Sequence, residues 1–130
     1  MSNCILFISP RAEDVRTLSM MLDPSRVTIR HAAGLRQALE LLAQQTFPAI
    51  LTESHLPDGD WRDVVQHVRQ HAKKTAVIVT DRFADGRFWI DVLEGGAYDL
   101  LPQPFYRAEV ERILAAAMNP PQVSRALPAA

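Results

Sequence analysis

The segment Pro48-Ala-Ile-Leu-Thr-Glu-Ser-His-Leu-Pro-Asp-Gly-Asp60 decides the fold, because a short apolar run ends there at a carboxylate and passes into a polar loop. Residues 49–51 show no polar alternation, which is typical of a strand covered by helices on both faces. The Pro-Asp-Gly sequence that follows has the composition of a turn. Functional groups of an open parallel sheet lie beyond the carboxyl ends of its strands, so Glu53 is the first candidate. The alternative is an exposed loop glutamate without a role.

Composition limits the classes of protein to which the chain can belong. It has 130 residues, 48% of them hydrophobic, which suits one domain with a single core. Fourteen Lys and Arg residues against fifteen Asp and Glu give a net charge of −1, so we expect this domain to bind neither nucleic acid nor membranes. Cys4 is the only cysteine, and no segment approaches the ~20 apolar residues that span a bilayer. We therefore expect a cytoplasmic protein.

Apolar runs alternate with helical patterns along the chain. Strands are predicted at residues 4–8, 27–29, 49–51, 76–80 and 98–101, and the last four helices at 35–42, 60–68, 88–93 and 106–118. The first helix is expected to begin at Pro10, with Ser9 as its capping residue. Asp60 is expected to cap the third helix.

Five strand-helix units with short connections predict an α/β fold with right-handed crossovers. We expect a flavodoxin-like, doubly wound (βα)5 domain, whose five-stranded parallel sheet has the order 2-1-3-4-5 and helices on both faces. Residues 1–118 form this domain, and residues 119–130 are interpreted as a C-terminal tail or linker containing Pro and Ala.

Several separated motifs together resemble the receiver domain of two-component response regulators, over roughly residues 3 to 118. They are the loop Leu56-Pro57-Asp58-Gly59, Thr80 at the end of the fourth strand, the sequence Glu94-Gly95-Gly96-Ala97 and the pair Pro104-Phe105. The resemblance implies the flavodoxin-like fold and a role in phosphorelay signal transduction. It also implies a set of phosphoryl-transfer residues at one end of the sheet.

The family's chemistry requires an aspartate nucleophile, an acid pair that holds Mg²⁺, and a hydroxyl and a lysine that engage the phosphoryl group. The matching positions here are Glu53 for the aspartate, Ser9 and Pro10 for the acid pair, Thr80 for the hydroxyl and Gln103 for the lysine. Four of these five positions differ from the family pattern. We therefore interpret the chain as a degenerate receiver, or pseudo-receiver, that works without phosphorylation.

The residues themselves give the same interpretation. Mg²⁺ is usually held by carboxylates and waters, and phosphoryl transfer depends on cations that neutralise charge, so neither metal nor cofactor is expected. Glu53 is instead expected to act as a fixed negative charge that accepts a hydrogen bond from Thr80, with Arg11 or Arg82 as counter-ion. The alternative is a receiver that takes a phosphoryl group on Glu53 with weak or no Mg²⁺ dependence.

Two other groups of side chains have metal-binding atoms. They are the loop residues Glu53, His55, Asp58 and Asp60, and the pair His67 and His71. Neither spacing matches a complete ligand pattern, so solvated polar side chains are the preferred interpretation.

A receiver without phosphorylation groups has only its surfaces with which to signal, so we expect a protein-interaction module rather than an enzyme. The partner would be another protein or an effector domain. The surface formed by the fourth helix, fifth strand and fifth helix is the predicted contact, and it would also serve a homodimer. Trp89, Tyr98 and Tyr106 are its expected aromatic residues, the first two exposed, with a buried Trp89 as the alternative. Leu100 stands where the family has an aromatic switch residue.

Overall fold

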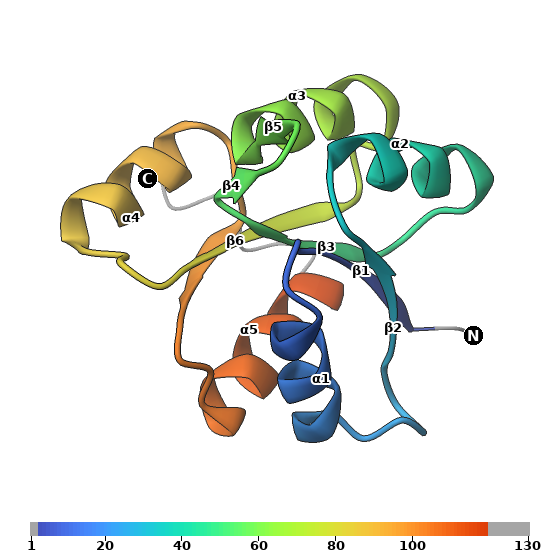
Figure 1. The fold of residues 1–130 in the computed structure, drawn as a ribbon, viewed down its shortest axis with the longest axis vertical. Helices are drawn as coiled ribbons and strands as arrows, with labels where there is room; N and C mark the ends of the chain where they lie inside the picture. The colour runs from blue at the N-terminus through green and yellow to red at the C-terminus, as the bar shows by residue number, and fades with distance from the viewer. Residues whose placement is uncertain (1–2, 120–130) are drawn as a thin grey trace, which may run out of the picture.

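Five parallel strands form the central sheet of the computed structural model, which describes residues 3–119 (Figure 1). The strands are β1 (Cys4–Ile8), β2 (Thr28–Ala32), β3 (Ala49–Glu53), β6 (Ala76–Asp81) and β7 (Asp99–Pro102), arranged in the order β2-β1-β3-β6-β7. This order confirms the predicted flavodoxin-like topology. It places β1 and β3 side by side, with Leu6 opposite Ile50 and Ile8 opposite Thr52.

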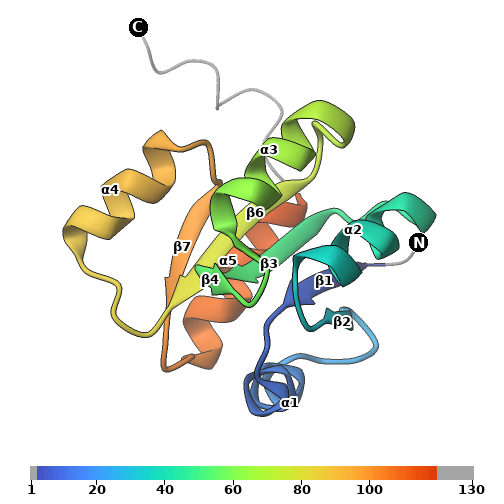
Figure 2. The same cartoon turned by 45° about the horizontal axis from the view of Figure 1, so that its top comes forward.

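Helices cover both faces of the sheet (Figures 1 and 2). On one face lie α1 (Ala12–Met21) and α5 (Arg107–Met118), and on the other lie α2 (Leu35–Gln44), α3 (Trp61–His71) and α4 (Gly86–Glu94). Alternate strand residues therefore enter different cores. Ile5 and Phe7 pack with α1 and α5, whereas Leu6 and Ile8 pack with the other three helices.

The edge strand β2 is less buried than the central strands of the sheet. Thr28 and Arg30 are exposed, while Ala32 is buried. In contrast, Ile5, Leu6, Phe7 and Ile8 of β1 are all fully buried, because helices lie on both sides of this strand.

Polar side chains cap the starts of three helices, including α4, where the Asp85 carboxylate accepts the Phe88 backbone N–H at 2.8 Å. Asp60 caps α3 as predicted: its carboxylate accepts the Asp63 backbone N–H, and the Asp63 side chain accepts the Asp60 N–H, which completes a capping box. At α2 the cap comes from a distant loop, since the Asp58 carboxylate accepts the N–H groups of Leu35 and Arg36 at 2.7 and 2.9 Å. These bonds hold the pKa of Asp58 below its usual range.

The predicted start of the first helix is wrong. Helix α1 begins at Ala12 rather than Pro10, and its capping residue is Arg11, in extended conformation. The Ser9 hydroxyl does accept a backbone N–H, that of Arg11 at 3.0 Å, but in a turn before the helix. Ser9 is fully buried beside Glu53, so its side chain belongs to the functional site.

A short hairpin was not predicted from the sequence. Strands β4 (His55–Leu56) and β5 (Gly59–Asp60) pair antiparallel in the loop after β3. Strands of two residues are too short for a periodic signal. The hairpin has a clear structural role, because it carries Asp58 to the amino end of α2.

The prediction for residues 119–130 falls mostly outside the described residues. Asn119 is the capping residue that follows α5, and nothing further along the chain is described. Within residues 3–119, none of the helices has both the length and the apolar character needed to cross a membrane.

The cap of α3 gives a first test. Replacing Asp60 by Ala removes the carboxylate that accepts the Arg62 and Asp63 backbone N–H groups, and we expect a loss of about 1 kcal/mol in the free energy of unfolding. Urea denaturation followed by circular dichroism measures this change. Glu111→Ala, at an exposed position within α5, is the control and should leave stability nearly unchanged. Equal midpoints for the two variants would contradict the assigned role of the cap.

Candidate functional site

The carboxyl ends of β1, β3 and β6 bring polar side chains together as the topology predicts. Ser9 follows β1, while Glu53 and Thr80 are register partners at the ends of β3 and β6. Gln103 follows β7 and reaches the same point. All four are buried, with exposed fractions of 9% or less, so they form a polar cluster sheltered from water.

Glu53 is held by two neutral hydrogen-bond donors. Its Oε2 atom accepts from the Ser9 hydroxyl at 3.2 Å and from the Gln103 amide Nε2 at 3.1 Å. The prediction that Thr80 donates to Glu53 is wrong. The Thr80 hydroxyl donates to the Leu101 backbone carbonyl at 2.6 Å, because β6 and β7 are neighbours, and itself accepts from Gln103 at 3.2 Å.

The predicted counter-ions do not contact Glu53 directly. Arg82 forms an ion pair with Asp14, with Nη2 at 3.1 and 3.3 Å from the two carboxylate oxygens, and its Nε donates to Gln103 Oε1 at 3.2 Å. Within residues 3–119 no ion pair involves Glu53, so Arg11 does not neutralise it either. Arg82 is connected to Glu53 indirectly, because Gln103 accepts a hydrogen bond from Arg82 and donates one to Glu53.

Asp14 is a site residue that the sequence analysis missed. It lies in the first turn of α1, where an acidic residue is common, and its side chain is only 13% exposed. Its carboxylate lies near that of Glu53 and pairs with Arg82. The sequence signal was weak, because a first-turn acid usually serves the helix itself.

The surroundings of Glu53 raise the pKa of its carboxyl group. Burial is the largest cause, since it penalises the charged form, and the neighbouring Asp14 carboxylate acts in the same direction. Hydrogen bonds from Gln103 and Ser9 oppose the shift, because they stabilise the carboxylate. Ionisation of Glu53 is therefore harder in the folded chain than in the unfolded one.

Ser54, His55 and Asp81 form a second set of polar contacts, next to Glu53 and Thr80 in the sequence. The Ser54 hydroxyl donates to the Asp81 carboxylate and contacts His55 Nδ1 at 3.1 Å. The other oxygen of Asp81 accepts the Phe83 backbone N–H at 2.6 Å. These contacts tie the loop after β3 to the loop that leads into α4.

The alternative metal sites lack the geometry for a complete ligand set. Among residues 3–119, no three His, Cys, Asp or Glu side chains lie close enough together to hold a metal ion. Asp58 and Asp60 are bound to the backbone at the starts of α2 and α3. His67 and His71 contact each other on α3, with ring centroids 4.6 Å apart, and burial lowers the pKa of His67.

The three aromatic residues of the predicted contact surface differ in exposure. Trp89 on α4 is 48% exposed and Tyr106, before α5, is 65% exposed, so a buried Trp89 is excluded. The Trp89 indole Nε1 donates to Asp99 at 3.4 Å. Tyr98 is half-buried, and the prediction of an exposed ring is corrected, because the ring packs with the core under α5. Leu100 is buried against the opposite core.

The family model described as the response regulator receiver domain matches residues 11–115. The chain belongs to the response regulator receiver family. This match covers most of the chain and confirms the resemblance inferred from the sequence.

Curated relatives of this receiver domain are longer proteins. It is 31% identical over 107 residues to the response regulator protein PilR of Pseudomonas aeruginosa, covering 82% of this chain and 24% of that protein. It is 30% identical over 110 residues to the transcriptional regulatory protein SrrA of Staphylococcus aureus, covering 85% of this chain and 45% of SrrA. The receiver domain thus spans less than half the length of either relative.

Solved structures share the fold. The beryllofluoride-activated NtrC4 receiver domain dimer aligns with a TM-score of 0.82 and 22% identity, over 89% of this chain and 96% of that one. The chemotaxis response regulator CheY4 of Vibrio cholerae aligns with a TM-score of 0.80 and 18% identity, over 90% and 99% of the two chains. At this identity the likeness concerns the fold alone.

The donor atoms present do not fit the Mg²⁺ ion that the family chemistry requires. Mg²⁺ favours octahedral coordination by carboxylate oxygens and waters. At the acid-pair positions stand the Ser9 hydroxyl, already bonded to Glu53, and Pro10, whose side chain has no ligand atom. The nearby Asp14 carboxylate is paired with Arg82.

The raised pKa of Glu53 predicts a pH-dependent difference between the wild type and Glu53→Gln. The folded state binds this proton more tightly than the unfolded state, so wild-type stability is lost as pH rises through the raised pKa. Glu53→Gln keeps an acceptor oxygen but does not ionise. We expect the variant to become progressively more stable than the wild type as pH rises above about 4.

Urea unfolding at several pH values measures this difference in the free energy of unfolding. Glu111→Gln, at an exposed position, is the matched control. A difference between wild type and Glu53→Gln that stays constant from about pH 4 to 8 would rule out the inferred burial penalty.

Proposed function

We propose that this receiver domain signals through protein contacts without being phosphorylated. The proposal rests on the burial and the hydrogen bonds of Glu53, which stands at the acceptor position. Its side chain is buried, and one oxygen already accepts hydrogen bonds from two neutral groups, Ser9 and Gln103. An attacking oxygen must be free and aligned with the phosphoryl donor, so these bonds oppose attack by Oε2 and fix the orientation of the carboxylate.

The electrostatics of the site support the same function. Phosphoryl transfer depends on cations that neutralise charge on the transferred group. The lysine position holds Gln103, a neutral amide, and the guanidinium of Arg82 is already paired with Asp14. A phosphoryl group on Glu53 would add negative charge close to Asp14. This arrangement favours a constant state of the site over a phosphorylation cycle.

Phosphorylation of Glu53 remains the second candidate function, and one observation favours it. A cavity of about 350 Å³ opens beside the site, and its lining includes Asp14, Arg82 and Gln103. Arg82 is 45% exposed there, so an anion entering the cavity would meet a guanidinium. The relatives named response regulators also make this the ordinary role of the family.

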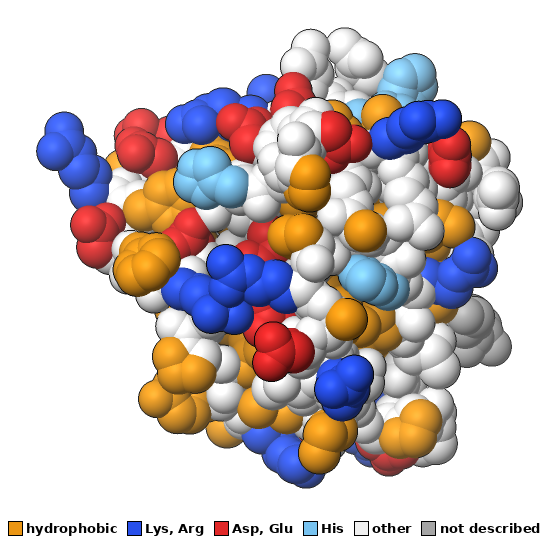
Figure 3. Space-filling model, in the orientation of Figure 1, with side chains coloured by type: hydrophobic (Ala, Val, Ile, Leu, Met, Phe, Trp, Pro, Cys, Tyr) orange, Lys and Arg blue, Asp and Glu red, His pale blue; other side chains and the backbone are white. Residues whose placement is uncertain are grey.

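The contact surface of the proposal is the α4–β7–α5 face, defined by Trp89, Ile90, Leu93, Asp99 and Tyr106. Four of these residues are apolar or aromatic and between 37% and 65% exposed. Figure 3 shows apolar side chains on the side of the molecule where α4 and the turn into α5 lie in Figure 1. Exposed aromatic residues of this kind are enriched in protein interfaces. The solved NtrC4 receiver domain is itself described as a dimer.

The partner in this proposal is a protein, either a second copy of the chain or an effector domain, and the module is not an enzyme. The relatives PilR and SrrA are longer than the region they share with this chain, so attachment to an effector is one form of the same function. Location in the cytoplasm belongs to the proposal as well, on the basis of the single, half-buried Cys4.

The two candidate functions differ in their response to Mg²⁺ and beryllofluoride. We expect the backbone amide NMR signals of Glu53, Thr80 and Gln103 to stay unchanged when millimolar Mg²⁺ and beryllofluoride are added. Mass spectrometry after incubation with acetyl phosphate should likewise show no added phosphoryl group. Saturable shifts centred on Glu53, or a mass increase lost in Glu53→Gln, would favour the second candidate.

The contact surface is tested with Trp89→Ala. If the α4–β7–α5 face mediates association, this variant should weaken a homodimer or partner complex by at least about tenfold, because buried Trp is a typical hot spot. Size-exclusion chromatography with light scattering measures the homodimer, and a pull-down measures a partner complex. Met20→Ala is the control, since Met20 is 73% exposed on α1, away from this face. If folded Trp89→Ala and Met20→Ala associate equally well, the interface does not involve Trp89.

A further inference from the structure

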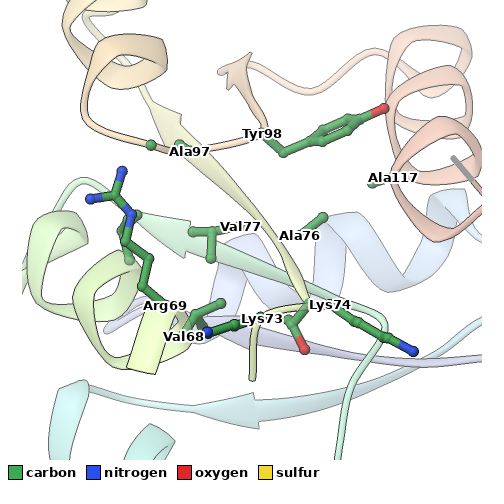
Figure 4. A pocket seen from close by; sticks show the side chains of 12 residues that line it. Val68, Arg69, Lys73, Lys74, Ala76, Val77, Ala97, Tyr98 and Ala117 are labelled. Atoms are coloured by element: carbon green, nitrogen blue, oxygen red, sulfur yellow. The ribbon is translucent and has the colours of Figure 1, made fainter. Parts of the chain in front are cut away.

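A cavity of about 470 Å³ lies at the amino ends of the strands, at the opposite end of the sheet from Glu53 (Figure 4). Its walls come from α3, the turn after α3, the starts of β6 and β7, and the end of α5. Val68, Val77 and Ala97 give it an apolar floor. The receiver chemistry uses none of these residues.

Positive side chains line one side of this cavity. Arg69 projects from α3, and Lys73 and Lys74 follow in the next turn, whereas Tyr98 and Ala117 lie across from them (Figure 4). Among the described residues, no Asp or Glu lines the cavity. The ion pairs found within residues 3–119 involve Arg36 and Arg82, so the three cations of the cavity are not neutralised by ion pairs in the described chain.

The Arg69 guanidinium is held in place at the cavity wall. Its Nη2 donates to the Gly95 backbone carbonyl at 3.3 Å, and the group lies directly against Gly96. Gly96 has a φ of 102°, and any side chain there would collide with the guanidinium. Since Arg has five N–H donors, further donors remain for a carboxylate ligand.

A second cavity, of about 610 Å³, adjoins the first. Lys73, Lys74, Thr75 and Ala117 line both, and the second adds His71 but again no acidic residue. The two cavities therefore make one groove along the amino ends of the strands, which we call the basic groove. An elongated groove with a row of cations suits an extended chain better than a compact molecule.

We propose that the basic groove binds an acidic, partly apolar segment of a partner protein. Carboxylates of the segment would pair with Arg69, Lys73 and Lys74, and an apolar side chain would enter above Val77 and Ala97. A small-molecule site usually has several precisely placed polar groups. Here the Thr75 hydroxyl donates to the Phe47 backbone carbonyl at 2.7 Å, so it can offer a ligand only an acceptor.

Charge makes residues 120–130 a poor occupant of the groove. The segment 120–130, which follows α5, contains Arg125 and no acidic residue, so it lacks the complementary charge. The groove also lies apart from the α4–β7–α5 face and from Glu53. Its function therefore does not depend on how the acceptor site works.

Fluorescence anisotropy tests the proposal with the full chain and a fluorescein-labelled peptide of about ten alternating Glu and Leu residues, an extended probe. We expect saturable binding that weakens with added salt. The double variant Lys73→Glu, Lys74→Glu should lose at least about tenfold in affinity, because attraction becomes repulsion. Both lysines are exposed, so the fold should persist, which circular dichroism would verify.

The matched control is Arg16→Glu, Arg87→Glu, which makes the same change in net charge at exposed positions outside both cavities. It should change the affinity by less than about twofold. Backbone NMR shifts on adding the peptide should map to Arg69, Thr75 and Ala97. No binding, equal losses in both double variants, or shifts centred elsewhere would overturn the proposal.

Competition experiments test whether the groove prefers an acidic peptide to other anions. The Gln-Leu analogue of the peptide should not bind, and inorganic phosphate or a short single-stranded DNA should not displace the acidic peptide at equal charge concentration. Displacement by phosphate alone would make the groove a simple anion site. Displacement by the DNA would indicate a nucleic-acid surface, and either result would refute the acidic-peptide assignment.

Discussion

Burial of the central strands on both faces is the constraint on which this structure depends. Residues 5–8 of β1 and 49–52 of β3 are completely shielded from solvent, with one core beneath α1 and α5 and the other beneath α2, α3 and α4. Parallel strands can be covered in this way only if the chain returns through a helix after each strand. All five strands then point the same way, so the residues that end them gather at one edge of the sheet.

The same burial determines the chemistry at that edge. Within the described chain, every buried side-chain nitrogen or oxygen has a hydrogen-bond partner. Around Glu53 this requirement produces a continuous network in which Ser9 and Gln103 contact the carboxylate, Arg82 contacts Gln103, and Asp14 contacts Arg82. The neutral amide of Gln103 thus lies between the buried acid and the guanidinium of Arg82. Such a network stabilises one arrangement and gives an incoming phosphoryl group few unoccupied partners.

Three regions of the molecule differ in polarity and charge, and so they suit different ligands. The end of the sheet with Glu53 carries the closed polar network. The α4–β7–α5 face exposes Trp89 and Tyr106, and the basic groove at the other end carries Arg69, Lys73 and Lys74 without acidic neighbours in its lining. An apolar face and a basic groove suit different protein ligands, so two partners could bind this domain at separate surfaces.

Local sequence determined the strands, the order of elements, the cap at Asp60 and the meeting of Ser9, Glu53, Thr80 and Gln103, because apolar periodicity and crossover rules fix topology. Tertiary structure alone decided which of these groups bond to one another. Thr80 donates to a neighbouring strand, and Gln103 replaces it as the donor to Glu53. Hydrogen-bond partners depend on distances of a few tenths of an ångström between distant segments, and sequence periodicity carries no such information.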